Sequence, residues 1–363
     1  MLVAVGSLCP TLAFANGLIR VAVADGILSA EVSGGPIRVT DLRDGAGLNG
    51  ARSQVRAVLK NGGVEVEGRR FSAVRLRPEG SQGLKVNGRE YPGILEVLRN
   101  GDGLAVVNEL PLEEYLVGVL KAEVSDGWPV EMLKAQAVVA RTYAAYHRQL
   151  NAGKPFHLVA SVAHQQYVGR VAPSSRMWLA VKETEGEMLH WEGQLFPAFF
   201  HTESGGHTED PRVVFAAANM PALKPVRDQF SGGSPHQHWS LDLALPALVG
   251  LLKKGGVSIG SVVRLEVLER GASLRVVRLA VHGTRGSAVL RGADFRKLVG
   301  NDSLKSTFFA VAVDKKYAHF AGRGYGHGIG LSQWGARAMA EQGYRYRQIL
   351  EFYYPGSTFS TLP

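Results

Sequence analysis

Residues 111–143 constrain the fold most, because they have the pattern of two helices joined by a short turn. Pro111 stands where a helix tolerates proline, and Glu113 and Glu114 place negative charge in the first turn, where the helix dipole favours it. Apolar side chains then recur at helical spacing on one face: Leu112, Tyr115, Leu116, Val119 and Leu120. The pattern predicts an amphipathic helix that ends near residue 123.

Glu123 is the misplaced residue of this helix. It continues the apolar stripe, and it lies at the helix end that disfavours negative charge. Desolvation and the helix C-terminus should make its carboxyl group hold a proton more tightly than a solvated one, as a general acid needs near neutral pH. The alternative is that Glu123 turns outward and pairs with Lys121 or Lys134, because the last turn of a helix often frays.

A second helix is predicted between Trp128-Pro129 and the stop signal Asn151-Ala152-Gly153. Its small side chains form a smooth surface against which another element can pack closely: Ala135, Ala137, Ala140, Ala144 and Ala145. Gln136 and Arg141 are polar residues within this stretch. Arg141 is either an exposed helix arginine or a buried donor aimed at a carboxylate or a sugar.

Four ordered blocks between about residues 108 and 355 resemble the SpoIID/LytB family. The first is the two-helix segment, with L-P-L-E-E-Y-L, A-E-V and L-K-A-Q-A-V-V-A-R-T-Y-A. The second contains Gln165 and Tyr167 and is similar to the family's Q-x-Y-x-G. The third is F-F-H-T-E-S-G-G-H-T-E-D at residues 199–210, and the fourth is G-R-G-Y-G-H-G-I-G-L-S-Q-W-G-A at residues 322–336.

The resemblance implies a lytic transglycosylase that cuts the glycan strands of peptidoglycan after their stem peptides are removed. It maps the family's catalytic acid onto Glu123. One carboxyl group would protonate the glycosidic oxygen and then deprotonate the muramyl 6-hydroxyl, which leaves a 1,6-anhydro end. LytB-type relatives are described as amidase enhancers, so the alternative is a non-enzymatic cell-wall module with an amidase as its partner. Such a module would not need an acid in apolar surroundings.

The other candidate site residues are expected to bind the glycan: Arg141, Gln165, Tyr167, His201, Ser204, Gly205, Gly206, Tyr325, His327, Ser332 and Gln333. The Ser204-Gly205-Gly206 run either lets a ligand approach the backbone closely, since glycine has no Cβ, or is simply a tight turn. The alternating glycines of residues 322–330 suit a flattened strand or a loop over which a sugar can lie. His327 belongs to that surface or is a structural histidine, and Ser332 should cap the following helix.

No metal or other cofactor is expected. Acidic and histidine side chains crowd residues 201–210, but the H-E-x-x-H spacing of zinc sites is absent. Some relatives bind zinc through Cys and His near the Q-x-Y block. Here His164 stands beside Gln165, and the single cysteine, Cys9, lies in the first segment of the chain.

The first segment has an apolar stretch followed by Ala13-Phe14-Ala15, which predicts a signal peptide, although no positive residue precedes it. The protein is therefore expected to be exported to the periplasm or cell envelope, and no later segment approaches a membrane-spanning length. The net charge of +9 comes from scattered Lys and Arg. It suits an anionic cell wall or ordinary solubility. Nucleic acid is not expected as a partner, because no basic run with interleaved aromatics occurs.

The expected fold class is α+β, with a helical catalytic core. The chain should divide into a signal peptide, a β-rich region, the core, an inserted mixed α/β module and the end of the core: residues 1–15, 16–107, 108–239, 240–318 and 319–363. Alternating patterns predict strands at 18–26, 36–42, 53–68, 94–100 and 103–107. In the module we expect a helix, a hairpin around Gly271 and a short helix, at 244–254, 262–282 and 293–299. The module shows no catalytic grouping and is interpreted as a scaffold or a substrate-side arm.

Overall fold

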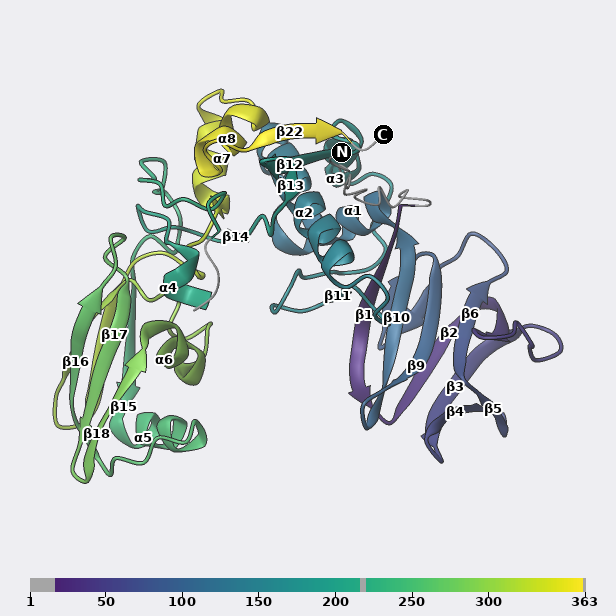
Figure 1. The fold of residues 1–363 in the computed structure, drawn as a ribbon, viewed down its shortest axis with the longest axis horizontal. Coiled ribbons are helices and arrows are strands. Elements are labelled where there is room, and N and C mark those ends of the chain that lie inside the picture. The colour runs from purple at the N-terminus through teal and green to yellow at the C-terminus, as the bar shows by residue number, and fades with distance from the viewer. Residues whose placement is uncertain (1–16, 216–219, 362–363) are drawn as a thin grey trace, which may run out of the picture. The chain divides into compact units, whose positions relative to one another are not determined.

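The computed structural model describes residues 17–215 and 220–361, so the expected signal peptide of residues 1–15, with Cys9, lies outside the described chain. Helices make up 23% and strands 38% of the residues, which confirms the α+β class. The chain forms two compact units (Figure 1). The N-terminal unit runs to Gly118 and also contains Leu150–Val171, and the C-terminal unit contains Val119–Gln149 and Ala172–Pro363.

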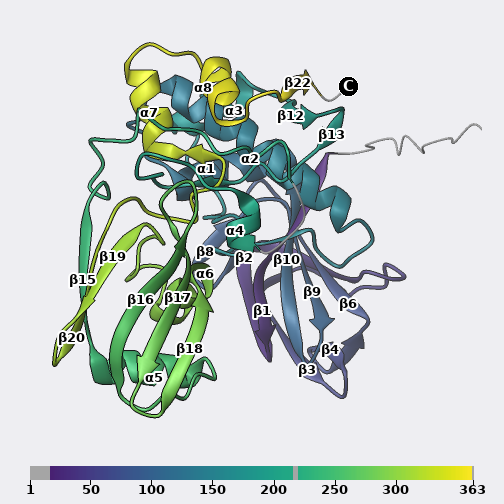
Figure 2. The same cartoon turned by 60° about the vertical axis from the view of Figure 1, so that its left-hand side comes forward.

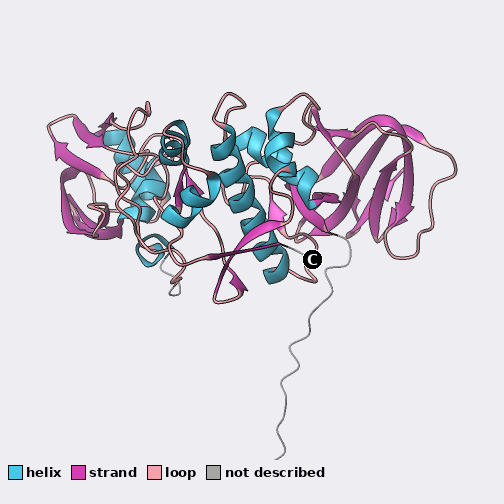
Figure 3. Ribbon diagram, turned by 90° about the horizontal axis from the view of Figure 1, so that it is seen from above, coloured by secondary structure: helices cyan, strands magenta, loops and turns pink. Residues whose placement is uncertain are grey.

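An eleven-stranded sheet dominates the N-terminal unit, and Figure 3 shows it as a curved layer. Its main strand order is β11-β1-β10-β9-β6-β2-β3-β4-β5, with β7 paired to β2 and β8. The strands are β1 (Leu18–Ile27), β2 (Ser29–Asp41), β3 (Arg52–Lys60), β4 (Gly63–Val66), β5 (Arg69–Phe71), β6 (Ala73–Pro78), β7 (Leu84–Val86), β8 (Arg89–Tyr91), β9 (Ile94–Asn100), β10 (Gly103–Pro111) and β11 (Leu158–Val159). The strands predicted from alternation are confirmed, and β5 to β8 and β11 were not predicted.

The sheet binds the segment that follows the second helix, which explains why this unit extends beyond the expected boundary at residue 107. Strand β11 pairs in parallel with β1. The Arg20 backbone N–H donates to His157 Nδ1 at 3.1 Å, and its Nε donates to the Pro155 oxygen at 2.9 Å. Arg20 also pairs with the fully buried Glu96 at 2.6 Å, and Arg75 pairs with the same carboxylate at 2.7 Å. The Glu96 carboxylate thus joins strands of the sheet to one another, while the hydrogen bonds of Arg20 to Pro155 and His157 attach the segment.

The two predicted helices are present as α1 (Leu112–Glu123) and α2 (Val130–Leu150). All five residues of the predicted apolar stripe on α1 are at most 3% exposed, and the alanines of α2 are buried as well. Pro111 ends β10 instead of opening the helix, which starts one residue later. Gly118 is required on α1, because a Cβ there would lie 2.4 Å from the Tyr167 ring. Within the described residues, no helix combines the length and apolar character needed to cross a membrane.

The C-terminal unit surrounds α2 with short elements. They are α3 (Arg176–Lys182), β12 (Glu187–Trp191), β13 (Gln194–Leu195), β14 (Phe200–His201), α4 (Pro211–Phe215), β21 (Leu331–Ser332), α7 (Gln333–Glu341), α8 (Tyr346–Tyr353) and β22 (Thr358–Thr361). Strands β13, β12 and β22 form one small sheet, and β14 pairs with β21. Ser332 caps α7 as predicted, since its side chain accepts a hydrogen bond from the Gly335 backbone N–H.

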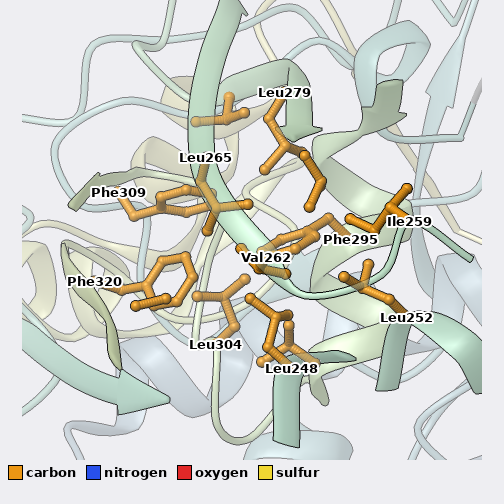
Figure 4. Close-up of a cluster of buried hydrophobic side chains, with 14 of the residues drawn as sticks. Leu248, Leu252, Ile259, Val262, Leu265, Leu279, Phe295, Leu304, Phe309 and Phe320 are labelled. Carbon is orange, nitrogen blue, oxygen red and sulfur yellow. The ribbon is translucent and has the colours of Figure 1, made fainter. Parts of the chain in front are cut away.

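The inserted module forms its own hydrophobic core within the C-terminal unit (Figure 4). Phe295, Phe309 and Phe320 lie at its centre and are at most 2% exposed. Two three-stranded sheets, β15-β20-β19 and β16-β17-β18, and two helices enclose it, and Figure 2 shows the second sheet clearly. The elements are β15 (Trp239–Ala244), α5 (Leu245–Lys254), β16 (Val262–Arg270), β17 (Val276–Gly283), β18 (Gly286–Arg291), α6 (Gly292–Val299), β19 (Phe309–Val313) and β20 (Tyr317–Gly322).

The predicted helices α5 and α6 and the β16–β17 hairpin of this module are confirmed. Strands β15, β18, β19 and β20 were not predicted. Strand β20 pairs with both β15 and β19. The module as folded therefore extends from Trp239 to Gly322, beyond the boundary expected at residue 318.

Candidate functional site

Two loops far apart in the sequence form one interleaved structure in the C-terminal unit. We call residues 199–210 the first loop and residues 322–332 the second loop. Strand β14 of the first loop pairs in parallel with β21 of the second. Glu203 and Tyr325 exchange two backbone hydrogen bonds of 2.9 Å each, and the Glu209 backbone N–H donates to the Gly328 oxygen at 2.8 Å. The structure thus brings together the third and fourth sequence blocks.

The glycines of these loops are needed for contact between the loops themselves. A Cβ at Gly330 would lie 2.0 Å from the Phe199 oxygen, and one at Gly324 would lie 2.8 Å from the Glu203 oxygen. Both residues also have positive φ, 69° and 74°, which excludes a flattened strand and leaves the loop, the other form that their alternation suggested. Gly206 differs, because a Cβ there would meet nothing within 4 Å. Close approach of the two loops therefore does not account for a glycine at this position.

Ser204 and Ser332 are fully buried and hold the loops together. The Ser204 hydroxyl donates to Asp228 Oδ2 at 2.7 Å and accepts from the Gly206 backbone N–H at 3.1 Å. The Ser204 backbone N–H in turn donates to Ser332 Oγ at 3.2 Å. Gln333 is only 3% exposed. The expected role of these side chains in glycan binding stays a prediction, and their contacts are those of an interior network.

His201 and His327 are joined through one peptide unit, that of Ile329. His201 Nδ1 lies 3.1 Å from the Ile329 oxygen, which can only accept, so this nitrogen carries a hydrogen. The Ile329 N–H donates to His327 Nδ1 at 3.0 Å, so that nitrogen carries a lone pair. The centroids of the two rings lie 5.6 Å apart, and the ring planes are tilted by 55°. Their partners therefore assign opposite tautomers to the two neutral rings.

The surroundings of this pair keep both rings uncharged near neutral pH. Burial, followed by the positive charges of Arg296 and Arg275, lowers the pKa of His327 to about 3. Burial, His327 and Arg275 likewise lower the pKa of His201 well below its ordinary value. Neither imidazole can then supply a proton to a substrate at neutral pH. The structural alternative for His327 is well supported by these contacts.

Two buried carboxyl groups in the loop region were missed in the sequence. Glu203 is 0% exposed, and burial together with the charge of Asp228 raises its pKa. Burial also raises the pKa of Asp228 against the hydrogen bond from Ser204. The Ser231 hydroxyl donates to Glu203 Oε1 at 3.0 Å. The crowding of acids and histidines at residues 201–210 was the available signal, but their burial could not be read from it.

Glu123 is the last residue of α1 and is half-buried. Lys121 pairs with Asp126, and Lys134 pairs with Glu131 at 3.0 Å and with Glu183 at 2.6 Å. Both lysines thus make their ion pairs with other carboxylates. The alternative in which one of them also pairs with Glu123 stays a prediction.

The turn after Glu123 is fixed on both sides. Ser175 Oγ at the start of α3 donates to Asp126 Oδ1 at 2.6 Å. The Trp128 ring meets the Trp334 ring edge to face at 5.4 Å, and the Arg337 guanidinium lies 4.7 Å from the Trp334 centroid. Trp334 also donates its backbone N–H to the Thr202 oxygen. This half-buried aromatic pair, which sequence reasoning missed, ties the turn beyond Glu123 to both loops.

Arg141 is fully buried, so its interpretation as an exposed helix arginine is wrong. Its guanidinium donates to the backbone oxygens of Glu187 at 3.1 Å and Val181 at 3.3 Å. These contacts attach α2 to β12 and α3. A role for Arg141 in binding a sugar stays a prediction.

Gln165 and Tyr167 are buried in the N-terminal unit, whereas the loops belong to the C-terminal unit. The Tyr115 hydroxyl donates to Gln165 Oε1 at 3.2 Å, and the Tyr167 hydroxyl donates to Asn108 Oδ1 at 2.9 Å. Burial raises the pKa of Tyr167 well above its ordinary value, so it stays a neutral phenol. Their contacts organise the helix–sheet junction, and their expected contact with glycan stays a prediction.

Tyr325 is half-buried on the second loop, and its hydroxyl donates to Asp302 Oδ1 at 2.7 Å. Among residues 17–215 and 220–361, no three His, Cys, Asp or Glu side chains are grouped so that they could share a metal ion. The histidines and acids of the first loop instead point to different partners. His207 Nδ1 lies 2.7 Å from the Thr208 oxygen, and Glu209 accepts a hydrogen bond from Ser273.

Comparison with known proteins gives two matching families. One, described as Stage II sporulation protein, matches residues 100–191, which include α1 and α2. The other is a domain of unknown function, DUF8618, and matches residues 221–330. The second match contains the whole inserted module and most of the second loop.

Three relatives illustrate the similarity. An uncharacterized protein of Brachyspira hyodysenteriae is 33% identical over 77% of this chain and 74% of its own length. The Stage II sporulation protein D of Bacillus subtilis is 28% identical over 83% of this chain and 88% of its own length. The Amidase enhancer of Bacillus subtilis is 29% identical over 92% of this chain, but the match spans only 53% of that longer relative.

Proposed function

Because the chain belongs to the SpoIID/LytB family, we propose that it is a lytic transglycosylase that cleaves peptidoglycan glycan strands through Glu123. One observation carries the proposal. Glu123 ends a helix whose apolar face is buried, it is itself half-buried, and both neighbouring lysines are engaged by other carboxylates. A half-buried carboxyl group at the end of such a helix keeps partial access to a substrate while it is partly removed from water.

The chemistry requires one group to act twice. The protonated Glu123 would donate its proton to the glycosidic oxygen as the bond to the muramyl C1 breaks. The resulting carboxylate would then take the proton of the C6 hydroxyl as that oxygen bonds to C1, which closes the 1,6-anhydro ring and restores the acid. Atoms and charges balance without water. Neither His201 nor His327 can replace Glu123, because both are held neutral.

The remaining features of the proposal concern place and partner. Glycan strands poor in stem peptides are the proposed substrate, and an exported location in the periplasm or cell envelope follows from that substrate. A second function is favoured by the relative named Amidase enhancer, in which this chain would bind the wall and stimulate an amidase without cutting glycan. The two functions differ in whether the chain alone generates new glycan ends.

The test measures those ends by mass spectrometry after purified, peptide-stripped glycan is incubated with the full chain. Wild-type protein should release 1,6-anhydro-muramyl products, and Glu123→Gln should lower their rate by at least about 10²-fold, because the amide has no proton to donate. Glu114→Gln, at the other end of the same helix, is the matched control and should stay active.

Equal release by wild-type and Glu123→Gln proteins would overturn the catalytic assignment. If the wild-type protein releases no anhydro products but accelerates a wall amidase, the second function holds instead. Hydrolysed, reducing muramyl ends in place of anhydro ends would contradict the proposed double role of a single carboxyl group.

A further inference from the structure

Arg275 connects the inserted module to both loops. It lies in the turn between β16 and β17, directly before β17 begins, and it is fully buried. Its Nη2 donates to the Ser204 backbone oxygen of the first loop at 2.7 Å. On the second loop, a Cβ at Gly328 would lie 2.6 Å from the Arg275 Nε, so only glycine leaves room for the guanidinium group.

Charge and hydrogen bonds join the same turn to the first loop. Burial, the largest influence, lowers the pKa of Arg275 to about 10, while the negative charge of Glu209 opposes this effect. Arg275 therefore remains a cation at neutral pH. Glu209 accepts a hydrogen bond from Ser273, two residues before Arg275, and its own backbone N–H donates to Gly328.

Packing alone does not explain an arginine at this position. Its Nε and Nη1 are buried and have no hydrogen-bond partner among the described residues. An unpartnered buried donor typically costs about 1–3 kcal/mol, and an apolar side chain of similar volume often replaces a buried ion at no loss of stability. The contacts of Arg275 with the two loops are therefore the part of its surroundings that calls for an arginine.

We infer that Arg275 is a positioning residue, through which the module fixes the conformation of the first and second loops. Other contacts from the module support the second loop in the same way. The Gly326 backbone N–H donates to the Lys305 oxygen at 2.9 Å, and Trp239 Nε1 donates to the Gly324 oxygen at 2.9 Å. The module is thus part of the loop structure, beyond the scaffold or arm expected from its sequence.

The arginine also sets the electrostatic surroundings of the histidine pair. The charged groups that act on this pair or on Arg275 come from α6, the hairpin turn and the first loop: Arg296, Arg275, Glu203 and Glu209. Removing the Arg275 cation should raise the pKa of both His201 and His327, because its charge opposes their protonation. An upward shift of both histidine pKa values is specific to the loss of this charge, since a purely structural packing role would not shift them in a set direction.

The test compares three variants of the full chain by hydrogen exchange with mass spectrometry. In Arg275→Met, backbone exchange in residues 199–210 and 322–332 should accelerate at least about tenfold, which corresponds to about 1.4 kcal/mol. Arg275→Lys keeps the charge but loses the planar guanidinium group, so its exchange rates should lie between those of Arg275→Met and wild type. Arg270→Met is the matched control, because Arg270 binds the Leu274 and Phe309 oxygens inside the module.

Unchanged exchange in both loops of Arg275→Met would overturn the inference. Equal acceleration in α5 and α6 would do so as well, since it would show loss of the module as a whole. If Arg275→Met fails to fold, the same exchange experiment is made on the double variant Arg275→Met with Glu209→Gln, in which one charge of each sign is removed. If the double variant also fails to fold, a purely structural role of Arg275 is favoured and the inference is overturned. For glycan cleavage the inference rests on the proposed function, but the exchange data decide it even if the wild-type chain cuts no glycan.

Discussion

The neutral histidine pair predicts how the C-terminal unit responds to acid. His327 has an ordinary pKa of 6.5 and a pKa of about 3 in the folded chain. A group whose folded pKa is depressed contributes stability above its unfolded pKa and loses it as the pH falls towards the folded pKa. Below pH 6.5, the unfolded chain therefore binds a proton at His327 while the folded chain does not, and the free energy of unfolding falls.

The size of this effect follows from the two pKa values. Between pH 8 and pH 5, the linkage relation gives a loss of about 2 kcal/mol from His327 alone, with a slope that approaches about 1.4 kcal/mol per pH unit. Glu203 and Asp228 act in the opposite direction, because their raised pKa values let the folded chain bind protons first as the pH falls. The wild-type profile alone cannot separate these groups, so the measurement must compare variants.

His327→Asn isolates the histidine. The Asn carboxamide oxygen can accept the hydrogen bond that the Ile329 N–H now donates to His327 Nδ1, and Asn does not titrate. Urea unfolding should be followed by tryptophan fluorescence, because all five tryptophans lie in the C-terminal unit with His327. Relative to wild type, the variant should gain about 2 kcal/mol in its free energy of unfolding on going from pH 8 to pH 5.

His319→Asn is the control with the opposite sign. Hydrogen bonds that the His319 ring donates to the carboxylates of Asp242 and Asp314 raise the pKa of His319, so its contribution to stability is present at low pH and is lost as the pH rises. This variant should therefore lose stability relative to wild type at pH 5. A difference between His327→Asn and wild type that stays constant within about 0.5 kcal/mol from pH 8 to pH 5 would refute the reasoning, because it would mean that His327 binds its proton in the folded chain.

Two further predictions concern the loops and the proposed chemistry. Gly330→Ala should lower the free energy of unfolding by at least about 3 kcal/mol, because a positive φ is combined with a Cβ placed 2.0 Å from the Phe199 oxygen. Gly343→Ala, with a positive φ but nothing within 4 Å of the new Cβ, should lower it by only about 1–2 kcal/mol. Equal losses of the two variants in urea unfolding would contradict the steric account. Dialysis against a chelator should leave glycan cleavage intact, because the proposed acid–base chemistry uses only Glu123, and restoration of lost activity by zinc would show that a metal takes part.

Sequence patterns predicted those helices and strands whose residue pattern lies within one continuous segment. Helices α1 and α2 follow from apolar spacing, first-turn acids and clear stop residues, and their buried faces are those that the spacing indicated. Strands β5 to β8 are short, three to six residues each, and their pairing depends on partners elsewhere in the sheet. Such strands carry too few residues for an alternating pattern to be distinguished from a loop.

The third and fourth sequence blocks come together in the structure, but the contacts of their residues join segments that are far apart in the sequence. Ser204 and Arg275 are 71 residues apart, and His201 and Ile329 are 128 apart. Nothing near Arg275 in the sequence marks it as buried, because its burial comes from loops of another segment. The glycine alternation suggested a surface for a sugar, whereas close approach of the first and second loops accounts for Gly324 and Gly330.

The distribution of exposed and buried groups explains why the proposal depends on Glu123. A general acid has to reach the glycosidic oxygen within hydrogen-bond distance, about 2.6–3.2 Å, or through one water molecule. Glu203 has the raised pKa of a suitable acid, but it is 0% exposed and could reach a substrate only if the loops opened. The histidines are neutral and clamped to the Ile329 peptide. Glu123 combines partial exposure with a helix end that disfavours negative charge, and for this reason we propose it, and not Glu203 or a histidine, as the acid.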